Sequence, residues 1–130
     1  MQKFTTFLMF EGRAEEAMNL YTTLFNNSSV KSITRNGKEG PGAEGTVLHA
    51  IFTLNGQEFM CIDSSVKHSF SFTPAISIHV DCVDDAEIEK IYTALMDGGS
   101  AMMPLGSYGF SKKFGWVADK FGVSWQLNLK

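Results

Sequence analysis

The sequence contains the same structural unit twice. Tyr21–Phe25 is echoed by Tyr92–Met96 at an offset of 71 residues, and a similar strand and acidic helical stretch precede each segment. A second echo relates Gly56–Met60 to Gly122–Gln126 at an offset of 66 residues. Equivalent positions of a duplicated unit are expected to face each other across one shared cleft. The repeat therefore selects the residues whose chemistry bears on function.

The first half is predicted to fold as a strand, a helix and three further strands. Phe4–Phe10 is almost wholly apolar and predicts a strand buried on both faces. From Ala14 to Phe25 the apolar residues recur at helical spacing, and Asn55–Gly56 predicts a two-residue hairpin turn. The remaining strands are predicted at Val30–Arg35, Thr46–Leu54 and Phe59–Asp63.

The second half repeats this order after a polar linker at residues 66–73. Ala75–Cys82 alternates and predicts a strand, and the spacing of Asp84 and Glu87 is that of a capping box at the start of the next helix. Three strands follow, near Ala101–Leu105, Lys113–Ala118 and Ser124–Leu129. We expect an α+β fold, a single domain of two βαβββ modules at about residues 1–65 and 74–130.

Composition excludes several classes of function. The net charge of −3 argues against a nucleic-acid surface, and no apolar run approaches the roughly 20 residues that span a bilayer. The N-terminus lacks the apolar region of a signal peptide, so a cytoplasmic protein is expected. Cys61 and Cys82 occur in apolar strands without a CxxC motif and are expected to be buried thiols, with a disulfide or a nucleophile as alternatives.

Three segments resemble the PhnB-like branch of the vicinal oxygen chelate superfamily, which is also described as 3-demethylubiquinone methyltransferase-like. These segments are Phe10–Ala17, Val47–Phe52 and, most specifically, Phe114–Leu127. The resemblance covers nearly the whole chain. It implies two curved sheets that close around a shared cleft, with the helices outside. Because members of this superfamily commonly pair, it also implies a homodimer.

Metal-using members of the superfamily take ligands from the first and last strands of each unit. The repeat places Thr6 opposite Ser77, and Met60 opposite Gln126, at these positions. Ni²⁺, Zn²⁺ and Fe²⁺ favour imidazole and carboxylate donors, which this set lacks. A shift of one residue, to Phe7, Cys61 and Ile78, does not supply them. We therefore predict no catalytic metal and no cofactor.

The remaining candidates are histidines and aromatic residues. His79 shares a strand face with Ser77 and Asp81 and is predicted to point into the cleft, where a histidine beside a carboxylate can act as a general base. The alternative is a histidine that only orients a ligand or makes a hydrogen bond. His49 is assigned to the cleft by the same alternation, and Phe114 and Trp116 either line the pocket or belong to the core.

Asp63 ends the last strand of the first half, off the face of Met60, and is expected to cap a turn. No GxGxxG loop, P-loop or GxSxG elbow is present, so no nucleotide-binding loop accompanies the methyltransferase description.

Three functions stay open. The first is a module that binds a small, partly apolar molecule. The second is a metal-independent lyase, isomerase or transferase with His79 as base and Gln126 or His49 orienting a carbonyl group. The third is a metal enzyme with unusual ligands.

Overall fold

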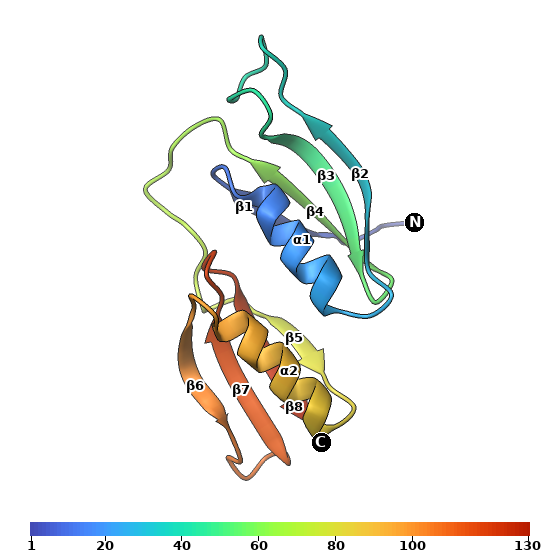
Figure 1. Ribbon diagram of the computed structural model, residues 1–130, viewed down its shortest axis with the longest axis vertical. Coiled ribbons are helices and arrows are strands. Elements are labelled where there is room, and N and C mark those ends of the chain that lie inside the picture. The colour runs from blue at the N-terminus through green and yellow to red at the C-terminus, as the bar shows by residue number, and fades with distance from the viewer. The chain divides into compact units, whose positions relative to one another are not determined.

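The computed structural model describes residues 1–130 and consists of two compact units, Met1–Ser69 and Phe70–Lys130 (Figure 1). The boundary between them falls within the segment 66–73 that was predicted as a linker. Each unit contains one strand, one helix and three strands, so the predicted α+β class with a repeated βαβββ order is confirmed. Neither of the two helices combines the length and apolarity needed to cross a membrane.

The first unit is a four-stranded mixed sheet with one helix packed on it (Figure 1). Its sheet has the order β1-β4-β3-β2, in which β1 is parallel to β4 and the other pairs are antiparallel. The elements are β1 (Thr6–Phe10), α1 (Ala14–Leu24), β2 (Ser29–Arg35), β3 (Val47–Leu54) and β4 (Gln57–Asp63).

The second unit has the same topology, with a sheet order of β5-β8-β7-β6 and with β5 parallel to β8. Its elements are β5 (Ile78–Asp81), α2 (Asp85–Met96), β6 (Ser100–Gly106), β7 (Lys113–Ala118) and β8 (Ser124–Leu129). The identical strand order in the two sheets shows that the repeat in the sequence is a repeat of topology.

Local sequence signals explain two of the boundaries. Asn55 and Gly56 have φ angles of 48° and 82°, the left-handed geometry of a two-residue hairpin turn, which confirms that prediction. At the start of α2 the Asp84 carboxylate accepts from the backbone N–H of Glu87 at 2.8 Å, and the Glu87 carboxylate accepts from that of Val83 at 3.1 Å. The first bond is the N-cap half of the predicted capping box, whereas the Glu87 side chain reaches the residue before the N-cap and not Asp84 itself.

The core of each unit lies between its helix and one face of its sheet. In the first unit Tyr21 of α1 packs on Phe52, which stacks on Phe59 at a centroid distance of 5.3 Å. In the second unit the side chains that meet in the core are fully or almost fully buried: Ile88, Ile91, Leu95, Val117, Trp125 and Leu127. Burying a large apolar side chain contributes roughly 1.5–3 kcal/mol, so these layers stabilise each unit.

Two predicted strands are shorter than expected. β1 begins at Thr6, and Phe4 before it is 85% exposed. Because β1 is an edge strand with a helix on only one side, Phe7 is half-exposed and the prediction of a strand buried on both faces is wrong. β5 begins at Ile78, and Ile76, which lies inside the predicted strand Ala75–Cys82, is 75% exposed.

Candidate functional site

Each sheet has one face covered by the helix of its own unit and one face that this helix leaves uncovered, here called the helix-free face. In β7 the helix side is marked by Gly115, where an added Cβ would lie 3.0 Å from the Tyr92 ring of α2. Lys113, on the same side, forms ion pairs with Asp85 and Glu89 of α2. Because side chains alternate along a strand, the residues between these positions point to the helix-free face.

The helix-free face of the second sheet carries a row of four side chains, one from each strand, here called the second-unit row. Met103 of β6 pairs with Trp116 of β7, Trp116 pairs with Gln126 of β8, and Gln126 pairs with His79 of β5. Neighbours in such a row have Cβ atoms about 4.5–5.5 Å apart. An indole, a carboxamide and an imidazole therefore lie side by side. Trp116 and Gln126 are half-buried, and His79 is exposed.

Hydrogen bonds hold the side chains around this row. The Trp116 indole Nε1–H donates to Ser124 Oγ at 2.9 Å, and the hydroxyls of Ser124 and Ser77 are 2.6 Å apart. At the other end of β5, Asn128 Nδ2 donates to Asp81 Oδ1 at 3.1 Å. The predicted residues Ser77, Trp116 and Gln126 thus meet on one face with His79.

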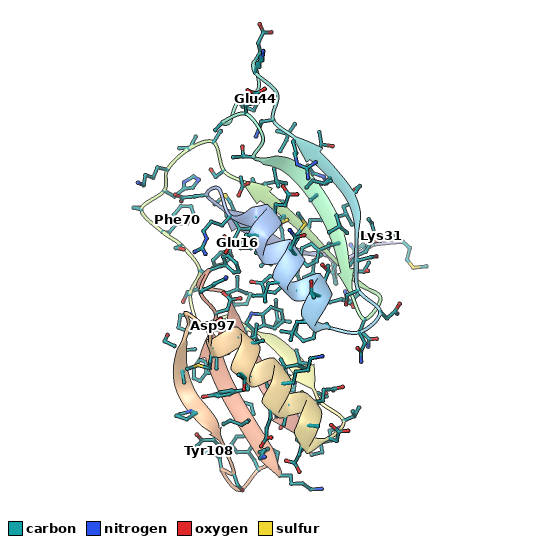
Figure 2. The ribbon with its side chains drawn as sticks, viewed as in Figure 1. Glu16, Lys31, Glu44, Phe70, Asp97 and Tyr108 are labelled. Carbon is teal, nitrogen blue, oxygen red and sulfur yellow. The ribbon has the colours of Figure 1, made fainter.

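An aromatic cluster lies beside the row. Tyr108, in the loop between β6 and β7 (Figure 2), and Phe110 of the same loop both pack on Phe114, at centroid distances of 6.4 and 5.0 Å. Phe114 shares the helix-free face with Trp116 but is only 7% exposed, because these two rings cover it. Phe110 is exposed and offers the outer apolar surface of the cluster.

The equivalent row of the first unit, here called the first-unit row, has different chemistry. Phe7 pairs with Met60, Met60 with Ile51, and Ile51 with Ser32. Met60 and Ile51 are half-buried and offer no nitrogen or oxygen donor. His49 lies two residues before Ile51 in β3, pairs with Thr34 and is also half-buried.

The strand pairing corrects the register of the repeat. Thr6 pairs with Phe59 on the side that α1 covers, whereas Met60 pairs with Phe7 on the helix-free face. Because Ile78 pairs with Trp125, Thr6 corresponds to Ile78 at an offset of 72 residues. The predicted equivalence of Thr6 with Ser77, and the placement of Thr6 beside Met60, are therefore wrong. The offset of 71 came from the helical segments and does not hold for the paired residues of β1 and β5, which correspond at an offset of 72.

The residues present do not fit the metal site that the resemblance implies. At the corrected positions the first unit supplies Phe7 and Met60, and the second supplies His79 and Gln126, so only one imidazole is a strong donor. Neither unit gathers three or more His, Cys, Asp or Glu side chains into a group that could hold a metal ion.

Two buried carboxylates have structural partners. Asp63 accepts from the backbone N–H groups of Gly12, Ala14 and Val47. It therefore caps the start of α1 and ties it to the start of β3, whereas the sequence led us to expect that it caps a turn. Asp119 accepts two backbone N–H groups and the Trp125 indole N–H at 2.9 Å. Carboxylates whose two oxygens both accept from such donors serve the fold.

Cys61 and Cys82 are free and buried. Burial, and then the nearby charge of Asp63, raise the pKa of the Cys61 thiol to about 12. Burial, and then the charge of Glu87, raise the pKa of the Cys82 thiol to about 11. Since the thiolate is the reactive form, neither residue is suited to act as a nucleophile near neutral pH.

Sequence reasoning missed Ser124, Tyr108 and Phe110. Ser124 could have been found, because polar residues at 124, 126 and 128 alternate with the apolar Trp125, Leu127 and Leu129 along β8. Such alternation places the polar set on one face. The packing of Tyr108 and Phe110 on Phe114 depends on the path of a loop and has no such signal.

Known proteins resemble this chain in sequence and in fold. The 3-demethylubiquinone-9 3-methyltransferase family matches residues 2–128. The structure of a PhnB protein from Bacillus cereus is 64% identical, with a TM-score of 0.97 over 99% of this chain and 100% of that chain. An uncharacterized protein from Mycobacterium bovis is 31% identical over 97 residues, 67% of this chain and only 61% of that relative's length.

More distant structures share the fold alone. FosX from Listeria monocytogenes, a genomically encoded fosfomycin resistance protein, has a TM-score of 0.66 at 9% identity, over 100% of this chain and 93% of that chain. The family match, which spans nearly every residue, agrees with the resemblance inferred from the sequence motifs. The chain belongs to the 3-demethylubiquinone-9 3-methyltransferase family.

Proposed function

We propose that this protein binds a small oxygenated organic molecule, whose polar group is held by the second-unit row. The observation that carries this proposal is the register of three strands, which sets Trp116, Gln126 and His79 side by side. A carboxamide both donates and accepts hydrogen bonds, and an imidazole can do either. Small-molecule sites typically combine such convergent polar groups with apolar and aromatic walls.

The distribution of polar groups between the units supports this choice. The first-unit row consists of Phe7, Met60, Ile51 and Ser32, and its three half-buried or half-exposed apolar members can only make apolar contacts. His49 and Thr6, which the sequence also suggested, lie outside this row. The polar contacts of a ligand therefore belong to the second unit, and no bound catalytic metal is part of the proposal.

The position of His79 supports an enzymatic alternative. His79 is exposed beside Gln126, so a carbonyl group held by the Gln126 amide would lie next to an imidazole. In this alternative His79 removes a proton from the carbon beside that carbonyl, as a general base near neutral pH. The methyl transfer in the family's description is not proposed, because no nucleotide-binding loop was found in the sequence.

The proposal is tested by NMR titration of the labelled protein with a panel of small amides, ketones and carboxylic acids. Perturbed amide resonances are expected in β5, β7 and β8. Gln126→Ala and His79→Ala should each weaken binding by roughly 3- to 10-fold, the effect of losing one hydrogen bond. Gln57→Ala and His68→Ala are matched controls outside the row and should change nothing.

Two other results would separate the hypotheses. If His79→Ala keeps its ligand affinity but abolishes turnover of that compound, the enzymatic alternative replaces simple binding. Perturbations confined to other parts of the chain, or no binding by any compound, would refute the proposed site. The shared cleft, the homodimer and the cytoplasmic location stay predictions.

A further inference from the structure

The indole of Trp116 is fixed by a chain of hydrogen bonds that no part of the proposed binding role requires. Its Nε1–H donates to Ser124, which bonds in turn to Ser77, and Ser124 is only 3% exposed. The three residues come from β7, from the start of β8 and from the position just before β5. The ring is therefore bonded to the neighbouring strand β8 and, through Ser124, to the residue that precedes β5.

This bond sets the direction in which the ring lies. Trp116 pairs in register with Gln126, while Ser124 lies two residues earlier on β8 and is a diagonal neighbour. Side chains of strands ordinarily stand roughly perpendicular to the sheet. To reach a diagonal partner at 2.9 Å, the indole must lean along the sheet towards β8. Its only polar atom is then occupied, and what it offers a ligand is the π surface of the ring.

We infer that Ser124 is a positioning residue, which holds Trp116 so that the site selects a flat, conjugated ring bearing a carbonyl group. The inference rests on the proposed function and names its ligand class. A planar ring can stack on the leaning indole while its carbonyl oxygen accepts from the Gln126 amide in the same row. The cluster of Tyr108, Phe110 and Phe114 extends the aromatic surface, because Phe114 lies two residues before Trp116 on β7 and the two loop rings pack on it.

The test compares two neutral probes, benzamide and cyclohexanecarboxamide, which carry the same carboxamide on a flat and a puckered ring. Stacking should favour benzamide by roughly 3- to 10-fold in the wild-type protein. Ser124→Ala should reduce this preference to below about 2-fold while the affinity for cyclohexanecarboxamide stays the same. Ser124→Thr keeps a hydroxyl at this position and should restore the preference.

A spectroscopic readout separates positioning from a merely structural role. Both tryptophans donate Nε1–H groups, Trp116 to Ser124 and Trp125 to Asp119. In Ser124→Ala the Trp116 Nε1–H resonance should move and that of Trp125 should not. If Ser124→Ala is poorly folded, Ser77→Ala removes the outer hydroxyl of the chain and should lower the preference in the same direction.

The inference also predicts non-additivity. Trp116→Leu should abolish the preference for the flat ring, and adding Ser124→Ala should then have no further effect on it. Equal affinity of the wild-type protein for both probes would overturn the inference and leave the proposed function standing. An equal loss of both affinities in Ser124→Ala would do the same. If neither probe nor any compound of the panel binds, the proposed function fails as well.

Discussion

Cys61 illustrates how one buried side chain responds to pH. Burial, together with the Asp63 charge, raises the pKa of its thiol to about 12 in the folded protein. In an unfolded chain a cysteine has a pKa of about 8.5. The folded state therefore holds its proton more tightly, and the stability that this thiol contributes is fully present below about pH 8.5. That contribution is lost as the pH rises through the folded pKa of about 12.

We predict that iodoacetamide at pH 8 modifies Cys61 at least roughly 100-fold more slowly in the native protein than in urea, because little thiolate forms. Cys82, whose pKa is raised only to about 11, should react faster than Cys61. Mass spectrometry of proteolytic peptides at timed intervals measures both rates. Modification of native Cys61 at the unfolded rate would show that the thiol is accessible and ionised.

At the scale of helices and strands, sequence patterns predicted the features that depend only on residues close together in the chain, such as turns and helix caps. The Asn55–Gly56 turn and the Asp84 N-cap of α2 are short-range features, and both occur at the predicted residues. Which residue of β1 corresponds to which residue of β5 depends on how each strand pairs with a strand that is distant in the sequence. The offset taken from the helices therefore assigned Thr6 to the wrong face. A shift of one residue moves a side chain to the opposite face of a sheet. The positions of the strands were therefore predictable from the sequence, whereas the residues that pair between strands were not.

Asp63 joins three elements of the first unit, and its replacement tests how they are held together. Its Oδ1 accepts from Gly12 and Ala14 at the start of α1, and its Oδ2 accepts from Val47 at the start of β3. In Asp63→Asn either orientation of the amide directs an N–H₂ group at a backbone N–H. We predict a loss of roughly 3 kcal/mol in the free energy of unfolding, measured with urea.

Asp97→Asn is the matched control for this variant, because Asp97 is exposed after α2 (Figure 2) and should lose less than about 0.5 kcal/mol. Equal stability of the two variants would mean that the Asp63 carboxylate does not organise these elements.

For the whole molecule, the duplication preserved topology and changed chemistry. Phe7, Met60 and Ile51 of the first-unit row correspond in strand pairing to His79, Gln126 and Trp116 of the second-unit row. The sequence predicts all three residues of the second set as candidates, because polar and aromatic side chains stand out in strands whose other face is apolar. It could not show that Phe114 is covered, since the covering rings come from a loop.

This divergence leads to a prediction about metal content. At the repeat-related positions the first unit offers a transition metal only a phenyl ring and a thioether, and the second offers one carboxamide and one imidazole, of which only the imidazole binds strongly. We expect the purified, dialysed protein to contain far less than one equivalent of Ni, Zn, Fe or Mn by elemental analysis. Adding Mn²⁺ or Zn²⁺ should not raise the melting temperature, because a ligand stabilises the fold only by binding it. His79→Ala is the control and should give the same metal content. A full equivalent that is lost in His79→Ala would show that this row holds a metal, and the metal-enzyme alternative would then replace simple binding.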